Sequence, residues 1–372
     1  MADYNECSEV SMVSNPLIVT KTGRAKAARL GHAGYDNPRE NIDPFIKTKA
    51  ISSKEYAGET SPIIIIAASD TPEKERRKAN YICDGTADEA EINTAIDTFN
   101  SITGGEIKLL KGIFNIASPI ILTGGVSLIG EGLNTTTLRA VASYNDNIVE
   151  WVPSTSDVYM CQIRDLKIDG NNQGTATTGI YFSSTGGGLP RDPQITRVFV
   201  LSCKGYGMRI INSWGIKILN SISEYCGENI SLESQTQAII QGCFFAYGTS
   251  ANGGMDIDQW SKEIQLIGNY FFNNDYHGLN CDGDYINISE NIFDGNGQDA
   301  ASDHIFLDAN SSFCMIEGNI FRTGTGTITE NIDDDGANNA IGFNSDTKGL
   351  SNTYVLSGAT LTFTNGILTG AA

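Results

Sequence analysis

The sequence predicts an all-β solenoid, in which short strands coil around one axis and stack on each other. Six segments between Val198 and Phe321 align without gaps and recur every ~18 to 28 residues, which is the signature of a stacked repeat. Apolar and polar residues alternate inside each segment, as they do in strands rather than helices. The segments are VFVLSCKG (198–205), IKILNSIS (216–223), AIIQGCFF (238–245), IQLIGNYF (264–271), INISENIF (286–293) and CMIEGNIF (314–321).

Two columns of this alignment are expected to face the core. Stacked amides can hydrogen-bond from coil to coil, and stacked phenylalanines can fill the space beside them, so neither column is given a catalytic role. The first column contains Cys203, Ser221, Cys243, Asn269, Asn291 and Asn319. The second contains Gly205, Ser223, Phe245, Phe271, Phe293 and Phe321.

The composition limits the classes of binding partner and the cellular compartment that fit this protein. The net charge of −19 argues against nucleic acid or an anionic membrane as partner, and no run of about 18 apolar residues could span a membrane. The eight cysteines lack metal-ligand spacing, so they are interpreted as structural thiols of a reducing cytoplasm, with Cys203, Cys243 and Cys281 pointing inward. The first residues lack a basic start followed by an apolar stretch, so we expect no secretory signal.

The chain is divided into three parts: a first segment (1–61), a solenoid (62–345) and a short β segment (346–372). The first has little periodicity and a locally basic stretch, KTGRAKAARLGHAG, and two interpretations remain open: a flexible tail, or an anchor that orders on a partner. The last contains two alternating strands around the turn Thr364-Asn365-Gly366, which predicts a hairpin.

A single amphipathic helix is expected over residues 84–99, with Thr86 and Glu89 as a capping box. Its apolar face should seal the open end of the solenoid, because a terminal coil needs a cover. Strands are expected on both sides of it. They are PIIIIAA (62–68) and YIC (81–83) before the helix, and residues 104–116, 118–132 and 135–141 as the first coils after it.

The order DGTADEAEINTAID, GGEIKLLKGIFNIASPIILTGGVSLIGEG, TTTLRA and IRDLKIDGNN resembles the pectate-lyase-like superfamily over roughly residues 63–345. The resemblance implies an all-β, right-handed parallel β-helix with an N-terminal capping helix and a short C-terminal β segment. That superfamily includes pectate lyases, polygalacturonases, sugar epimerases and bacteriophage tailspikes, so the fold alone does not name a reaction. The C-terminal stretch is similar to closing segments of phage structural proteins, which favours a virion protein and implies a homotrimer.

A second strand follows the phenylalanine column in each repeat, and its outward residues are the candidates for chemistry. Carboxylates stacked at the strand spacing of ~4.8 Å repel each other, which splits their pKa values as glycoside hydrolysis requires. Three interpretations stay open: a hydrolytic site, a Ca²⁺ site, and a solvated stripe without chemistry. One outward column contains Ile211, Glu233, Asp258, Asp282, Asp308 and Asn344, and its neighbour contains Arg209, Ser231, Asp256, Asn280, Phe306 and Gly342.

Glu233, Asp258, Asp282 and Asp308 are the predicted catalytic residues. Substrate-binding residues are expected beside them, because they lie on the same few coils and offer a carboxylate, an aromatic face and two imidazoles. These are Asp256, Trp260, His277 and His304. No metal ligands and no cofactor are predicted, apart from the Ca²⁺ alternative. Polygalacturonase motifs are absent, and no basic group lies in the acidic column for lyase chemistry.

The leading hypothesis is a phage-type virion appendage or capsid decoration protein. Residues 1–61 would bind other virion proteins, and the β-helix would bind host surface polysaccharide. The chain would be made in the host cytoplasm and act outside the cell as part of the particle. The alternatives are a polysaccharide depolymerase, acting as hydrolase or lyase, and a purely structural surface protein.

Overall fold

A computed structural model describes residues 62–99, 104–123, 125–151, 157–184, 188–346, 353–356, 359–364 and 367–371. The predicted attachment segment, residues 1–61, lies outside them. Among the described residues, no helix has the length and apolar character needed to cross a membrane.

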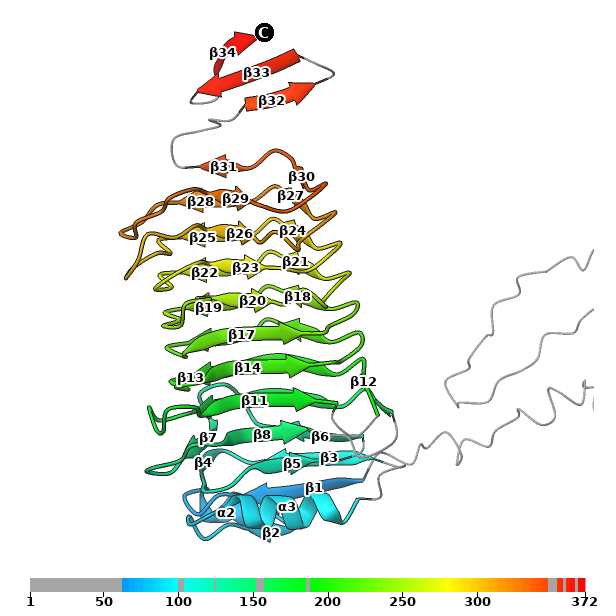
Figure 1. The fold of residues 1–372 in the computed structure, drawn as a ribbon. Coiled ribbons are helices and arrows are strands. Elements are labelled where there is room, and N and C mark those ends of the chain that lie inside the picture. Colours follow the sequence, from blue (N-terminus) through cyan, green and yellow to red (C-terminus); the bar gives the residue numbers. More distant parts are fainter. Residues whose placement is uncertain are drawn as a thin grey trace, which may run out of the picture. The chain divides into compact units, whose positions relative to one another are not determined.

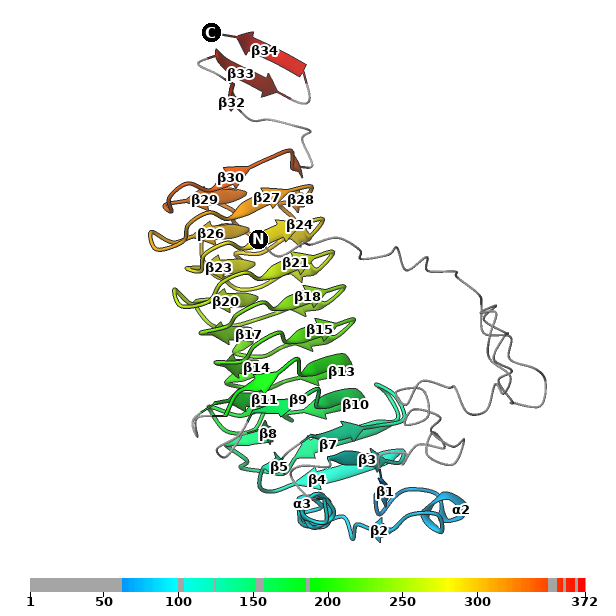
Figure 2. The ribbon, with the colours of Figure 1, turned by 90° about the vertical axis from the view of Figure 1, so that its right-hand side faces the viewer.

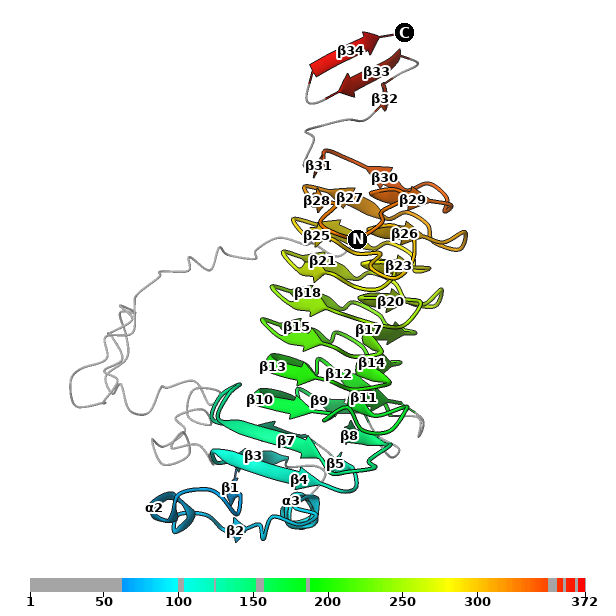
Figure 3. The same ribbon diagram turned by 90° about the vertical axis from the view of Figure 1, so that its left-hand side faces the viewer.

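The described residues between 63 and 346 form a parallel β-solenoid, so the predicted fold is confirmed (Figure 1). Each coil contributes to three sheets, and every strand pairs in parallel with the equivalent strand one coil away. Figures 2 and 3 show the first and third sheets side by side along the stack. Parallel strands need long crossovers, and here the rest of each coil provides them.

The first and second sheets are continuous through the long strands β10 (Gln162–Asp169) and β13 (Gln194–Leu201), which belong to both. The first sheet begins with β1 (Ile63–Ala67), which pairs with β3 (Gly105–Leu109) and with the short strand β2 (Tyr81–Ile82). Its other strands are β6 (Val126–Ile129), β15 (Lys217–Leu219), β18 (Ile239–Gln241), β21 (Gln265–Ile267), β24 (Asn287–Ser289), β27 (Met315–Glu317) and β30 (Ala340–Ile341). Those of the second are β4 (Gly112–Ile116), β7 (Thr136–Ala140), β16 (Ile222–Glu224), β19 (Phe244–Ala246), β22 (Tyr270–Phe272), β25 (Ile292–Asp294), β28 (Ile320–Arg322) and β31 (Ser345–Asp346).

The third sheet carries the second strand of each predicted repeat. Its nine strands are β5 (Ile120–Leu122), β8 (Asn147–Trp151), β11 (Thr178–Ser183), β14 (Tyr206–Ile211), β17 (Glu228–Glu233), β20 (Met255–Ile257), β23 (Leu279–Cys281), β26 (Ile305–Leu307) and β29 (Ile332–Asp334). A two-stranded pair lies beside the stack, formed by β9 (Val158–Tyr159) and β12 (Pro190–Arg191).

The core contains both predicted ladders. The side-chain oxygen of Asn291 accepts hydrogen bonds from the backbone N and the Nδ2 of Asn269, at 2.9 and 3.1 Å, and Asn319 does the same for Asn291. The rings of Phe271 and Phe293 stack with their centroids 4.6 Å apart. Every amide in this ladder has partners, so burying it carries little desolvation cost. The seven described cysteines are free and buried.

The amide ladder extends one coil further than the sequence indicated. Asn344 donates to and accepts from core groups: its Oδ1 accepts from Asn319, and its Nδ2 donates to the carbonyl of Ile316. Placing Asn344 in the outward acidic column was therefore wrong. The segment 340–344 was aligned as a second strand, but β30 belongs to the first sheet. The second strand of the preceding coil, which contains β27 and β28, is β29.

The expected helix is α3 (Glu89–Asp97), and it packs on the first coil. Before it come β1 (Ile63–Ala67), the short helix α2 (Glu73–Arg76) and β2 (Tyr81–Ile82). Ile92, Ala95 and Ile96 are fully buried, as the pattern predicts. The capping box is absent, because the carboxylate of Glu89 accepts instead from the backbone N–H of Ala117 in the coil below.

The described C-terminal residues form an antiparallel sheet of three strands. The predicted hairpin corresponds to β33 (Ala359–Thr364) and β34 (Ile367–Ala371), which pair up to Thr364 and Ile367. A strand that the sequence did not predict, β32 (Thr353–Leu356), pairs with β33.

Candidate functional site

The outer face of the third sheet displays the predicted columns. Register pairs Arg209 with Ser231, Ser231 with Asp256, and Asp256 with Asn280. The column then continues through Phe306 to Asp333, where the sequence alignment had placed Gly342. We call this surface the acidic face. Its defining residues are Glu228, Glu233, Asp256, Asp258, Asp282, Asp303, Asp308 and Asp333.

The four predicted catalytic carboxylates come from successive coils. Backbone hydrogen bonds fix their stacking: the N–H of Asp258 donates to the Leu232 carbonyl, and that of Asp282 to the Ile257 carbonyl, at 3.0 and 2.8 Å. Asp308 repeats the bond to Cys281. The structure therefore brings the four together in sequence order, at the spacing of adjacent strands. Their side chains nevertheless have different tasks.

Glu233 is held in an ion pair. The guanidinium of Arg209 donates two hydrogen bonds to its carboxylate, at 2.6 and 3.1 Å, and lies over the ring of Tyr206. Bidentate pairing of this kind fixes both side chains. Glu233 therefore contributes to the charge and shape of the face, and is poorly placed to act as an acid or a nucleophile.

Asp258 organises the turn after β20. Its Oδ1 accepts from the backbone N–H of Ser234 at 2.9 Å and from the hydroxyl of Ser261 at 2.7 Å, with a longer bond of 3.2 Å from Trp260. A carboxylate that accepts from its own turn is the usual reason for Asp at this position. Asp258 thus has a structural role that the sequence pattern did not reveal.

Among the described residues, neither an ion pair nor a backbone hydrogen bond holds the side chain of Asp282 or of Asp308. Burial raises the pKa of Asp282 to about 6, and repulsion from Asp308 and Asp256 and a hydrogen bond with the Asp308 carboxyl add to the rise. The Oδ1 atom of Asp282 is buried without a hydrogen-bond partner. A carboxyl group with a raised pKa beside a second carboxyl group is able to serve as an acid while its neighbour acts as a base or nucleophile.

Asp256 and Glu228 lie one coil and two coils before Asp282. Burial raises the pKa of Asp256, although Asn280 opposes the rise by donating a hydrogen bond of 2.7 Å. Burial raises the pKa of Glu228 to about 8, with repulsion from Asp256 as the next cause. Glu228 was missed in the sequence, because it begins its strand outside the aligned columns. An acidic residue directly before the alternating pattern was the only available signal.

His277 belongs to the acidic face, whereas His304 does not. The backbone N–H of Asp303 donates to Nδ1 of His277 at 3.1 Å, so that ring nitrogen is unprotonated, and the ring stacks on Phe306. His304 is fully buried, with Nδ1 3.1 Å from Asn296 and its ring stacked on Phe321. Its predicted contact with substrate is therefore wrong. The ring lies between the phenylalanine column and a second amide ladder, in which Asn274 donates a hydrogen bond of 2.8 Å to Asn296.

Trp260 is the most exposed aromatic side chain beside the face, at 69%. It lies in the turn after β20, next to the Asp258 bonds that fix its backbone. An exposed indole held by an ordered turn presents a flat apolar surface at little entropic cost. This placement agrees with the predicted substrate-binding position, which stays a prediction.

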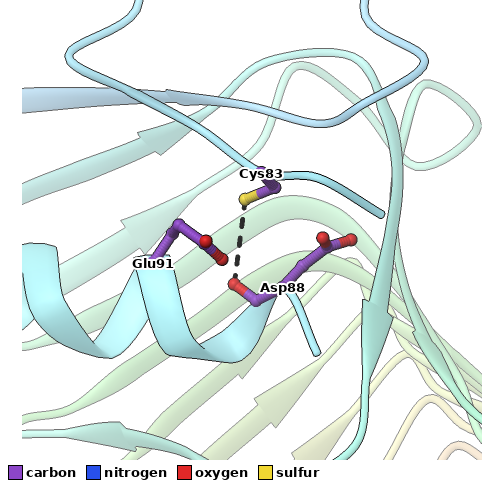
Figure 4. Close-up of side chains that lie close together, drawn as sticks. All are labelled: Cys83, Asp88 and Glu91. Carbon is purple, nitrogen blue, oxygen red and sulfur yellow. Dashed lines mark hydrogen bonds between the residues drawn. The ribbon is translucent and has the colours of Figure 1, made fainter. Parts of the chain in front are cut away.

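One cluster of possible metal ligands occurs among the described residues, and it lies elsewhere. Cys83, Asp88 and Glu91 have ligand atoms within 4.8 Å of one another at the start of α3 (Figure 4). Burial raises the pKa of the Cys83 thiol, which opposes the thiolate that a metal needs. The carboxylate of Asp88 accepts from the backbone N–H groups of Gly85 and Asn115. These contacts join the start of α3 to the first coil, and they fit that structural role better than a metal site.

The solenoid is similar to solved viral and bacterial proteins. ORF18 of Geobacillus virus E2 matches with a TM-score of 0.57 and 16% identity, over 74% of this chain and 66% of that one. Tailspike protein 2 of Escherichia coli O157:H7 bacteriophage CAB120 matches with a TM-score of 0.48 and 14% identity, over 76% and 44%. The A-module of mannuronan C-5 epimerase AlgE6 from Azotobacter vinelandii gives 0.46 and 16%, over 71% and 96%.

No family model and no curated protein matches this chain. The chain spans just under two thirds of the length of the Geobacillus virus E2 protein. At 16% identity the likeness concerns the fold, and it agrees with the parallel β-helix described above.

Proposed function

We propose that this chain is a virion protein of the phage appendage type, whose acidic face binds host surface glycans. The observation that carries the proposal is a continuous, rigid outer sheet that combines aligned carboxyl groups with an exposed indole and a stacked imidazole and phenyl ring. Carboxylates accept hydrogen bonds from sugar hydroxyls, and aromatic faces cover sugar rings. The fold shared with a Geobacillus virus E2 protein supports the viral setting.

The test is a binding screen of the purified chain against immobilised bacterial surface polysaccharides. We expect at least one glycan to bind, and the double variant Trp260→Ala, Phe306→Ala to weaken that binding severalfold. Trp214→Ala is the matched control, because Trp214 is also exposed but lies in a turn that leads into the first sheet. Failure of every glycan to bind, or equal loss in the control, would contradict the proposal.

A depolymerase is the second candidate, and the pair Asp282 and Asp308 favours it. Protonated Asp282 would donate its proton to the glycosidic oxygen as that bond breaks, while the Asp308 carboxylate attacks the anomeric carbon. Water would then hydrolyse the glycosyl-enzyme, with Asp282 taking the proton back. Adjacent coils separate the two residues by ~4.8 Å, which is close to the separation in retaining enzymes.

Release of new reducing ends from a bound polysaccharide tests this second candidate. The pKa of Asp282 is about 6, so the acid form is lost as the pH rises through that value and kcat/KM should fall with it. Asp282→Asn and Asp308→Asn should each abolish cleavage, whereas Glu317→Gln, an exposed residue of the first sheet, should not. Activity that persists in both Asn variants would move the site elsewhere.

For assembly, we propose that three copies associate through the second sheet, and that residues 1–61 attach the chain to other virion proteins. The outward column of that sheet is apolar through six successive coils, and none of its side chains is fully buried. Soluble proteins rarely expose so continuous an apolar stripe without a partner. The column contains Phe199, Ile222, Phe244, Tyr270, Ile292 and Ile320.

A further inference from the structure

The acidic face is nearly free of positive charge. In the nine described strands of the third sheet, Arg209 is the only Lys or Arg, and both its hydrogen bonds go to Glu233. The strands of the face therefore offer no free cation for a carboxylate, sulfate or phosphate group of a ligand, and the turn after β20 contributes one exposed lysine, Lys262. Placing an anionic glycan along the face would add charges of the same sign at close range, which is unfavourable.

Two carboxyl groups of the face have atoms that lack a partner. Glu228 is only 5% exposed, and its Oε1 has no hydrogen-bond partner; the Oδ1 of Asp282 is also buried and unpartnered. Glu228 lies beside Asp256, which raises its pKa by repulsion, so it belongs to the same surface. Unpartnered buried oxygens are costly unless a bound group donates to them.

The spacing of the carboxyl groups indicates the size of that bound group. Among the described residues, the Cys83 cluster is the only set with three ligand atoms within 4.8 Å of one another, so no three carboxyls of the acidic face converge on one ion. They are instead spread along the stack, one coil apart, at ~4.8 Å. This is close to the length that one pyranose ring adds to an extended glycan. An extended chain with repeated donors fits such a row better than a single Ca²⁺ ion, which needs converging oxygens.

We propose that the acidic face selects a polysaccharide that carries free amino groups. An ammonium group donates up to three hydrogen bonds and brings the positive charge that the face lacks. The inference rests on the proposed glycan binding and specifies its ligand class. It also separates this chain from a binder of polyuronates, whose carboxylates would need the cations that are missing here.

Calorimetric titration of the full chain at low salt tests the inference with three oligosaccharides. The glucosamine oligomer and its N-acetylated form share a backbone and differ in the ammonium group, and oligogalacturonate supplies the anionic case. We expect the glucosamine oligomer to bind at least about tenfold more tightly than the N-acetylated form, and oligogalacturonate not to bind. Added salt should weaken the binding.

The net charge of −19 alone could attract a cationic glycan, so matched variants are needed. The face variant combines Glu228→Gln, Asp256→Asn and Asp282→Asn. The control combines Glu263→Gln, Glu290→Gln and Glu317→Gln, and it removes at least as much negative charge from exposed residues outside the third sheet, because Glu228 holds a proton at neutral pH. The face variant should lose about tenfold or more in affinity and the control little, with unchanged circular dichroism in both.

Four results would overturn the inference. Equal loss in both variants would reduce the binding to net charge. Equal affinity for the N-acetylated oligomer, or tighter binding of oligogalacturonate, would refute selection by the amino group while leaving glycan binding by the face intact. Absence of glucosamine binding would refute it as well, and the polysaccharide screen described above would then decide separately whether the proposed function survives.

Discussion

Glu228 shows how burial changes an acidic residue at the edge of the acidic face. Its pKa rises from 4.5 to about 8, chiefly through burial, although hydrogen bonds from Ser231 and Asn252 oppose the rise. Between these two values the folded chain holds a proton that the unfolded chain has released. The free energy of unfolding should therefore decrease as the pH rises from about 4.5 to about 8.

Glu228→Gln removes this titration and keeps the shape of the side chain. We expect the variant to lose less stability than the wild type between about pH 5 and about pH 8.5, by up to a few kcal/mol, since each pKa unit corresponds to about 1.4 kcal/mol. Chemical denaturation at the two pH values measures the difference. Glu317→Gln is the exposed control and should follow the wild type; identical pH dependence in all three proteins would contradict the burial of a protonated Glu228.

At the scale of single residues, the sequence predicted the inward positions far better than the outward ones. Asn269, Asn291 and Asn319 were identifiable because each must repeat the same contact in every coil. Outward residues do not have to repeat the same contact in every coil. The sequence placed Glu233 and Asp258 correctly in the column, but Arg209 and Ser261 decide their roles, and those partners are 24 and 3 residues away. No column pattern contains that information.

At the scale of elements, the repeat predicted strands well and end structures less well. The alignment failed at residues 340–344, because the last coils are less regular and a first strand resembles a second one in apolar alternation. Helix α3 was predicted from its own periodicity, but not its junction. At its first turn, Asp88 and Glu89 accept hydrogen bonds from backbone N–H groups of the coil below, and Asp88 also accepts one from Gly85.

Helix α3 should act as a removable cover of the first coil. Ile96→Ala deletes a fully buried side chain and should cost about 2–4 kcal/mol locally. Because each coil of a solenoid contacts only its neighbours, the effect should be confined to the near end. Hydrogen exchange should accelerate in β3, β4 and β5 and stay unchanged in β24 to β26. Asp97→Ala, on the exposed side of α3, is the control; uniform acceleration along the stack would contradict this view.

At the scale of the whole molecule, the three sheets have different outer surfaces. The third is acidic, whereas the second carries the apolar column from Phe199 to Ile320. The charges of Arg322 and Asp294 beside that column partly neutralise each other, because Nη1 of Arg322 lies 3.7 Å from Oδ2 of Asp294. The same carboxylate oxygen accepts a hydrogen bond from the hydroxyl of Tyr270. A chain with a net charge of −19 can self-associate most easily through such a surface, because the acidic faces then point away from one another.

Phe244 lies in the middle of the apolar column and contacts the rings of Tyr270 and Phe272. Phe244→Asp would bring three carboxylates together in a trimer centred on this column, so we expect the assembly to fall to monomers at micromolar concentration. Chromatography with light scattering measures the mass. Gln241→Asp, an exposed change on the first sheet of the same coil, should leave the trimer intact. A monomeric wild type, or a trimer that survives Phe244→Asp, would contradict association through the second sheet.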